Sequence, residues 1–222
     1  MKFIGHWSKS RVLNPNYLIE KTPNSELRTP NSELRLLIVN FIKMREIVTP
    51  RLKLRQWQEE DKEPFFRLNS DPRVMKFMPK LLSREESDNF VERIKGQFKK
   101  DGYSFFAVEL IENQTFIGLI GLSVPKFQSF FTPCVEIGWR LAYDYWGTGY
   151  ATEGAKASLD YGFNELNLSE IVSFTVPQNL RSRQVMERIG MRFIDEFQHP
   201  LLPEGHSLRK HVLYKINQRK EL

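Results

Sequence analysis

A turn built around two glycines is the part of this 222-residue sequence with the clearest capacity to bind a ligand. Gly147 and Gly149 stand one residue apart, just before a segment with the apolar spacing of a helix. Glycine lets a backbone approach a ligand closely and adopt positive φ angles. A helix that begins there directs free N–H groups and its positive dipole end at the turn, which suits a pyrophosphate. A tight strand-to-helix turn without a ligand would show the same glycines, so the pair alone leaves both interpretations open.

The elements on either side place this turn at the end of a strand. Residues 134–141 are expected to form the strand before it, and residues 151–166 the helix after it. Residues 170–176 are apolar and β-branched, as in a buried strand. Asn179 then favours the start of another helix, because its side chain can accept a hydrogen bond from a free N–H of the first turn. Ser182 follows three residues later.

The rest of the segment from Thr49 to Ile216 alternates in the same way. The order of elements predicts an α/β sandwich around a mixed sheet. Further strands are expected at 51–55, 104–110, 115–124, 191–197 and 211–216, and further helices at 61–69, from the Ser83–Glu86 capping-box pattern to Gly102, and from Asn179 to Gly190.

The same segment resembles the acyl-CoA-binding core of the GNAT acetyltransferase superfamily, in the RimJ/RimL-like branch that acetylates ribosomal-protein N-termini. The family signature Q/R-x-x-G-x-G/A matches here at Gly149 and Ala151, while Trp146 replaces the leading Gln or Arg. Three further motifs agree with the family: the Asn179-x-x-Ser182 helix start, the stretch Glu187 to Met191, which resembles E-K-x-G-F, and the stretch Val135 to Leu141, which resembles E-I-G-x-x-L.

This resemblance implies a fold, a cosubstrate and a set of contacts. The fold would be a GNAT-like mixed, mostly antiparallel central sheet of about seven strands, flanked by four helices. The cosubstrate would be acetyl-CoA, with no metal, held in a cleft between the Glu136 strand and the Ile171 strand. The expected contacts are largely backbone ones, at Ile137, Gly138, Trp139, Gly147, Thr148, Gly149, Tyr150, Ala151, Thr152, Asn179, Ser182 and Arg183.

Direct acetyl transfer requires a base for the amine, donors for the thioester oxygen and help for the leaving sulfur. The resemblance makes Glu136 the candidate base, provided that burial raises its pKa. A structural carboxylate that satisfies backbone groups is the alternative. Ser182 resembles the serine near the thiol in this branch, and helix capping is its alternative role. A backbone N–H near Ile137 or Gly138 would serve the oxyanion, and Arg181 or Arg183 could meet phosphates or be solvated.

The cysteine and the histidines give only weak indications of nucleophilic or metal chemistry. Cys134 is the single cysteine, so neither a disulfide framework nor a cysteine-based zinc site is expected, and no histidine nearby in sequence would activate it as a nucleophile. His199, His206 and His211 surround a Pro/Gly loop at spacings that fix no metal geometry. They could shape the acceptor site or brace the loop.

The charge distribution argues against a nucleic-acid-binding protein. The formal net charge is +6, but residues 1–43 hold seven Lys/Arg and three Glu, so only +2 belongs to the rest. No apolar run approaches the ~20 residues of a membrane span, and the N-terminus lacks the apolar core of a secretory signal. We therefore expect a cytoplasmic protein without nucleic-acid or membrane partners, as a monomer or a homodimer.

The first 43 residues do not share the alternating pattern of strands and helices that the rest of the sequence shows. The heptad TPNSELR occurs twice in succession, at 22–28 and 29–35, and each copy carries a helix-interrupting proline. We interpret residues 1–43 as a disordered leader, with Met44 as a candidate natural start and residues 44–222 as the acetyltransferase domain. A partner-binding tail is the functional alternative.

The sequence therefore predicts an acetyl-CoA-dependent N-acetyltransferase that acts directly on a primary amine, such as a protein N-terminus. Two alternatives stay open: acetylation of a small amine, such as a polyamine, amino acid or antibiotic, and a CoA-binding sensor that has lost turnover. Variable helices and loops form the acceptor pocket, so the acceptor is not identified.

Overall fold

Eight strands and four α-helices alternate along residues 46–218, the part of the chain that the computed structural model describes. The predicted leader therefore lies outside the described residues. The strands are β1 (Ile47–Val48), β2 (Leu52–Arg55), β3 (Phe105–Leu110), β4 (Phe116–Ser123), β5 (Glu136–Leu141), β6 (Glu170–Thr175), β7 (Arg192–Gln198) and β8 (Lys210–Asn217). The helices are α2 (Lys62–Ser70), α3 (Arg84–Asp101), α4 (Tyr150–Asn164) and α5 (Leu180–Arg188), with short 3-10 helices at Glu59–Asp61 and Tyr143–Tyr145.

The strands form one mixed sheet in the order β1-β2-β3-β4-β5-β6-β8-β7. Every neighbouring pair is antiparallel except β5 and β6, which confirms the predicted mixed, mostly antiparallel sheet and its four flanking helices. The sheet has one strand more than the seven expected. The extra strand, β1, is only two residues long, too short to produce an alternating pattern in the sequence.

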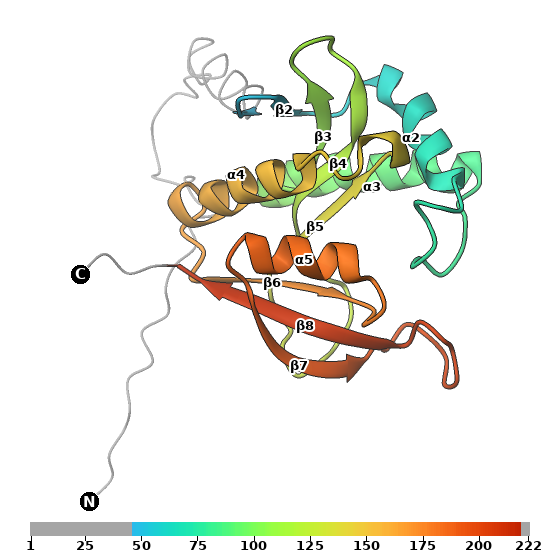
Figure 1. Cartoon of the computed structure of the whole chain (residues 1–222), viewed down its shortest axis with the longest axis vertical. Coiled ribbons are helices and arrows are strands. Elements are labelled where there is room, and N and C mark those ends of the chain that lie inside the picture. The colour runs from blue at the N-terminus through green and yellow to red at the C-terminus, as the bar shows by residue number, and fades with distance from the viewer. Residues whose placement is uncertain (1–45, 219–222) are drawn as a thin grey trace, which may run out of the picture. The chain divides into compact units, whose positions relative to one another are not determined.

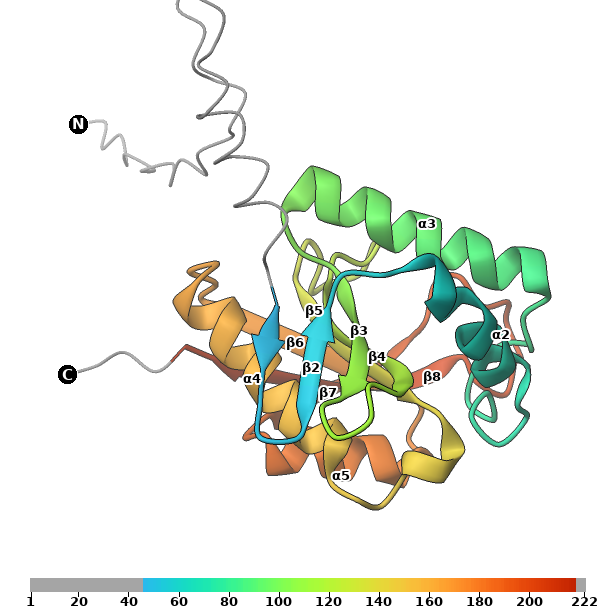
Figure 2. The same cartoon turned by 90° about the horizontal axis from the view of Figure 1, so that it is seen from above.

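Helices cover both faces of this sheet (Figures 1 and 2). Apolar side chains of α4 and α5, such as Leu159 and Met186, pack on one face together with Ile137 and Leu141 of β5. The other face meets α2 and α3 through a second cluster. Since successive side chains of a strand point to opposite faces, Glu136, Gly138 and Arg140 lie on the α2–α3 side.

The predicted helix signals are confirmed at α3. Ser83 Oγ accepts from the backbone N–H of Glu86 at 3.2 Å, and the Glu86 carboxylate accepts from the N–H of Ser83 at 2.9 Å. Gly102 ends the helix at φ +79°, in the left-handed region that glycine adopts without strain. These two signals set where α3 begins and ends in the sequence.

Arg55 is buried, although its alternation with Leu52 and Leu54 predicts that it lies on the exposed face of a half-buried strand. It is only 5% exposed, and its guanidinium donates to Asp61 at 2.7 Å and to Glu109 at 2.6 Å. Two carboxylates compensate the buried charge and join β2 to β3 and to the segment that starts α2. None of the described helices is long and apolar enough to cross a membrane.

Candidate active site

The glycine turn connects β5 to α4 and presents a row of backbone donors. Gly147 and Gly149 have φ angles of +81° and +90°, which explains why glycine stands at both positions. From Gly147 to Thr152, none of the six successive backbone N–H groups donates a hydrogen bond to a described residue. The four helical N–H groups of a first turn lack intrahelical partners in any helix, and here the turn adds further donors to them. This cradle of donors fits an anion.

Arg51 holds the turn in place from the neighbouring edge of the sheet. Its Nη1 donates to the carbonyl of Thr148 at 3.0 Å, and its guanidinium lies 4.5 Å from the centroid of the Tyr150 ring. Its Nε and Nη2 also bind the Glu153 carboxylate at 2.7 and 2.6 Å, and Thr49 donates to the same carboxylate at 2.6 Å. Glu153 would otherwise repel an anion at the start of α4, so Arg51 both orients the turn and neutralises that charge.

A tryptophan and an arginine form the other border of the turn. Trp146, which replaces the family's Gln or Arg, donates its indole N–H to the carbonyl of Leu141 at 2.8 Å. The guanidinium of Arg181, at the start of α5, lies 5.2 Å from the centroid of the Trp146 ring. Arg181 is exposed, so the site has a cation beside the turn even though the signature position itself holds none.

The two strands beyond the turn separate, as the resemblance implies. Strands β5 and β6 pair only at Glu136 and Val172. At the point of separation, Ser173 Oγ donates to the carbonyl of Ile137 at 2.9 Å. The hydroxyl thus closes the narrow end of a wedge that opens toward the glycine turn.

Trp139 of β5 turns its backbone groups into this wedge. Ala142 N–H donates to the carbonyl of Ile117 at 2.9 Å, which continues the β4–β5 ladder and fixes its alternation. Gly138 therefore directs its backbone groups at β4, and Trp139 directs its N–H and C=O at β6. No described residue pairs with Trp139 there. Of the amides predicted to meet the thioester and its arm, that of Trp139 faces the open edge.

The start of α5 forms the opposite wall. Asn179 caps the helix by accepting from Ser182 N–H at 3.4 Å and donates to Thr175 Oγ1 at 3.0 Å, so both its amide oxygen and its amide nitrogen have a partner within the protein. The Ser182 hydroxyl makes no hydrogen bond to any described residue and stays available to a ligand. Arg183 instead donates to the carbonyl of Pro177 at 3.1 Å and to the Tyr214 hydroxyl at 3.3 Å. The geometry gives Arg183 a bracing role, and Arg181 is the arginine nearer the turn.

Glu136 lies on the opposite side of the wedge, on the sheet face of α3. Burial raises the pKa of its carboxyl from 4.5 to about 7. Its carboxylate forms no ion pair or hydrogen bond with the described residues. Across the β4–β5 ladder it faces Ser123, whose hydroxyl donates to Gln97 of α3 at 3.3 Å. A carboxylate with this pKa can accept a proton near neutral pH.

Cys134 and the histidines take structural positions. Burial, together with the nearby Glu136 and Glu170 carboxylates, raises the pKa of the Cys134 thiol to about 11, so it is protonated and a poor nucleophile. The rings of His199 and His211 lie 4.9 Å apart within a cluster of phenylalanines. Burial lowers the pKa of His199 to about 4. Among the described residues, no group of three His, Cys, Asp or Glu side chains is placed to hold a metal ion.

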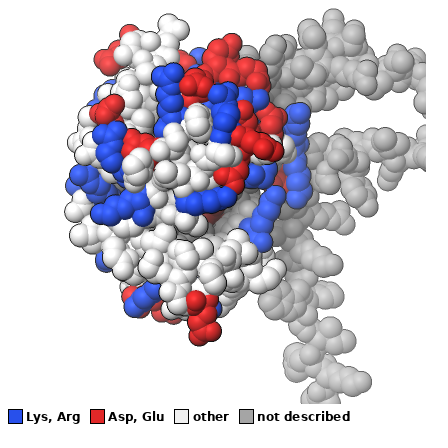
Figure 3. Space-filling model, turned by 90° about the vertical axis from the view of Figure 1, so that its right-hand side faces the viewer, with Lys and Arg blue, Asp and Glu red and all other residues white. Residues whose placement is uncertain are grey.

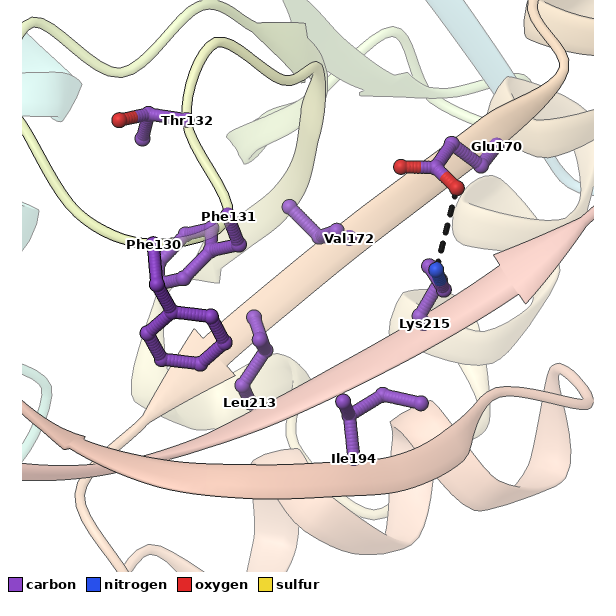
Figure 4. Close-up of a pocket in the computed structure, with 8 residues that line it drawn as sticks. All are labelled: Phe130, Phe131, Thr132, Glu170, Val172, Ile194, Leu213 and Lys215. Atoms are coloured by element: carbon purple, nitrogen blue, oxygen red, sulfur yellow. Dashed lines mark hydrogen bonds and ion pairs between the residues drawn. The ribbon is translucent and has the colours of Figure 1, made fainter.

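A cavity of about 320 Å³ lies apart from the wedge, over β6 and β8 (Figure 4). Phe130 and Phe131 close one side of it, and the ion pair between Glu170 and Lys215, at 3.1 Å, closes another. A second cavity of about 220 Å³ lies beside α2. No residue of the glycine turn lines either cavity.

The structure thus brings together residues of β5, of the turn that follows it and of α5, together with Arg51 before β2 and Ser173 of β6. The glycine turn, Trp139, Ser182 and Glu136 all border the separated strands. Arg51 and Ser173 were not identified by sequence reasoning. Arg51 has the polar appearance of a solvent-facing strand residue, and its partner Glu153 is 102 residues away, so no local signal marks either one.

Comparison with known proteins agrees with this geometry. Residues 51–192 match the Acetyltransferase (GNAT) domain family. The chain is 34% identical over 171 residues to an uncharacterized N-acetyltransferase, YnaD, of Bacillus subtilis, covering 77% of this chain and 95% of that protein.

Solved structures give the same result. The fold is similar to that of a GNAT-family acetyltransferase from Bacillus anthracis, with a TM-score of 0.65 and 33% identity over 78% of this chain and 98% of that one. It also resembles RimL, a ribosomal L7/L12 α-N-protein acetyltransferase solved with coenzyme A, with a TM-score of 0.63 and 15% identity over 78% of this chain and 98% of that one. The predicted resemblance to the RimJ/RimL-like branch is confirmed at the level of fold. This chain is a member of the GNAT N-acetyltransferase family and an acyltransferase.

Proposed function

We propose that this protein transfers the acetyl group of acetyl-CoA directly to the α-amine of an acceptor. The observation that carries the proposal is the cradle of six N–H groups, without partners among residues 46–218, at the mouth of a strand wedge. A pyrophosphate suits the cradle, because backbone donors and a helix dipole both favour an anion there. The pantetheine arm would then run along the open edge of Trp139 toward Glu136.

Each residue has a defined task in the transfer. Acetyl-CoA supplies an activated thioester. Glu136 takes the proton that the amine loses as its nitrogen bonds to the acetyl carbon. The Trp139 N–H faces the place where the carbonyl oxygen gains negative charge. The C–S bond breaks, the sulfur leaves with the electron pair as a thiolate, and the Ser182 hydroxyl donates a hydrogen bond to it; Glu136 then releases the amine's proton to solvent.

The pKa of Glu136 favours an α-amine over an alkyl amine. An α-ammonium group has a pKa near ~8, and a lysine-like ammonium one near ~10.4. Moving a proton from each to a carboxyl of pKa about 7 costs roughly 1 and roughly 5 kcal/mol respectively. Protein N-termini, peptides and amino acids therefore fit this site better than polyamines.

Thermal unfolding of the full chain with acetyl-CoA tests the cosubstrate site. At 100 times its Kd, the ligand should stabilise the fold by about 2.7 kcal/mol, which raises Tm by roughly 5–10 °C. Acetyl-pantetheine, which has the thioester but no pyrophosphate, is the control and should give a much smaller rise at equal concentration. Equal effects of the two ligands, or none from acetyl-CoA, would refute the role of the glycine turn. Binding without transfer to any amine would instead support the CoA-binding sensor.

A further inference from the structure

Arg140 lies on the same sheet face as Glu136, near the opposite end of β5, and carries a charge that the protein leaves uncompensated. Its Nη1 donates to Asn69 Oδ1 at 2.6 Å and its Nη2 contacts Met78 Sδ at 3.3 Å. No carboxylate of the described residues lies within ion-pair distance of it. Arg55, on the same face of the sheet's other half, shows the usual arrangement, with two carboxylates around a buried guanidinium.

The surroundings of Arg140 orient its guanidinium without neutralising it. Asn69 is fully buried at the end of α2, and its Nδ2 donates to Ser87 Oγ of α3 at 2.9 Å. That bond directs the Asn69 oxygen at Arg140 and therefore holds the guanidinium in place. The ring of Phe90 lies 5.7 Å from it on another side. Burial among these neutral groups lowers the pKa of Arg140 to about 10, so it stays charged at neutral pH.

Arg140 is partly buried, and a charge withdrawn from water without an opposite charge beside it is costly unless a ligand completes it. The guanidinium has five N–H donors in a planar fork, and Asn69 and the weakly accepting sulfur of Met78 engage only part of them. A carboxylate is the partner that this fork binds best. Figure 3 looks onto the side of the molecule where the α2–α3 connection and the β7–β8 loop project, and it shows a hollow with Lys and Arg side chains at its rim.

We infer that Arg140 recognises a carboxylate of the acceptor, so that the acceptor is an α-amine with an acidic group a few bonds away. This inference rests on the proposed function and specifies its substrate class. The two ends of such a molecule match the two uncompensated groups of β5, since the amine meets Glu136 and the carboxylate meets Arg140. A polyamine would instead place a second cation against Arg140.

The spacing of the two residues limits the length of the acceptor. They are four residues apart on one strand, so their Cα atoms are separated by about 13 Å. Both side chains leave the strand on the same face. Phe105 lies between them, because its Cε1 is 3.1 Å from the place where a Cβ on Gly138 would stand. An acceptor that meets both groups therefore has to bridge at most about 13 Å, the length of about four extended residues at ~3.5 Å each.

The test compares acceptor peptides that differ in one charge. The probes are the amidated peptides Ala-Ala-Glu-Ala and Ala-Ala-Gln-Ala, assayed on the full chain with acetyl-CoA. A charge-assisted hydrogen bond should make kcat/KM about 10–100-fold higher for the Glu peptide, mainly through KM. The unamidated dipeptide Ala-Gln, with its free carboxylate, shows whether a short free acid or an internal acidic side chain is the better source of the charge.

Three variants separate recognition from folding. Arg140→Met should reduce the Glu-over-Gln preference to less than about threefold. Asn69→Asp, which is close to isosteric, should do the same with Arg140 still present, because the new carboxylate neutralises the guanidinium. Arg67→Met, which removes an exposed arginine of α2, should keep the wild-type preference.

The possible results distinguish this inference from the proposed function. Equal rates for the two peptides, or a preference that survives in both Arg140→Met and Asn69→Asp, would overturn the role of Arg140 and leave acetyl transfer intact. If the chain acetylates neither peptide, the proposed transfer to an α-amine is in question. In that case, calorimetry on the CoA-bound chain measures the Kd of each peptide, and the ratio of the two Kd values replaces the ratio of kcat/KM. Equal or undetectable binding of the two peptides there would refute the inference as well.

Discussion

Replacing Glu136 with Gln should slow the reaction and stabilise the fold at the same time. The folded-state pKa of about 7 lies above the usual 4.5, so the folded protein binds this proton more tightly than the unfolded chain does. Stability therefore falls as pH rises from about 4.5 to 7, because the carboxylate must ionise where burial disfavours it. A glutamine resembles the protonated acid and avoids that cost.

The magnitude follows from the difference between the two pKa values. A difference of about 2.5 units corresponds to about 3 kcal/mol at pH 8 and to less than about 1 kcal/mol at pH 5. Because a domain of this size gains roughly 2–4 °C per kcal/mol, Glu136→Gln should raise Tm by about 6–12 °C at pH 8 and by little at pH 5. The neighbouring Cys134 thiol stays protonated over this range, so it does not produce the same pH profile.

The kinetic half of the prediction uses the same carboxylate. Loss of a general base lowers kcat/KM by about 10²–10⁴-fold, and the rise of the wild-type rate through about pH 7 should disappear in the variant. The measurements are thermal unfolding at pH 5 and pH 8 and a pH–rate profile for one peptide. A structural carboxylate that satisfies backbone donors would behave in the opposite way. Glu136→Gln would then lower Tm at pH 8, and that result would refute the assignment.

Three further substitutions test the glycine turn, the arginine that holds it and the cap of α5. Gly149→Ala forces a side chain into φ +90° at a cost of about 1–2 kcal/mol, and calorimetry should show at least about tenfold weaker acetyl-CoA binding; unchanged Kd would contradict the turn's role. Arg51→Met frees the Thr148 carbonyl and leaves Glu153 uncompensated, so acetyl-CoA Kd should rise about tenfold by a repulsion worth ~1 kcal/mol or more, and Arg51→Lys should recover only part of it. Asn179→Ala removes a helix cap worth about 1 kcal/mol and should lower Tm by about 2–4 °C; no change in Tm would show that the cap contributes nothing.

Local patterns in the sequence predict most of the fold. The capping box at Ser83, the Asn179 cap and the apolar spacing of α4 all depend on residues within one or two turns, and each is found where expected. Strand β1 could not be predicted, because two residues show no period. The burial of Arg55 could not be predicted either, since its partner Glu109 is 54 residues away.

The same division applies to the candidate site. The glycine turn was recognisable because positive φ angles and a following helix both leave local signals. The hydrogen bonds from Arg51 to the Thr148 carbonyl and from Ser173 to the Ile137 carbonyl join segments that are distant in sequence. They therefore become visible only in the folded structure. The alternation of side chains along a strand is enough to place Arg140 on the same face as Glu136. The absence of a carboxylate around Arg140 depends instead on how α2 and α3 pack.

Acetylation of a peptide with one α-amine and one lysine tests the central claim most directly. The full chain is incubated with acetyl-CoA and such a peptide, and the released thiol and the position of the acetyl group are measured by mass spectrometry. We expect one CoA thiol released for each acetyl group, with the acetyl on the α-amine. No thiol release, or acetylation of the lysine at an equal rate, would contradict direct transfer to an α-amine with Glu136 as base.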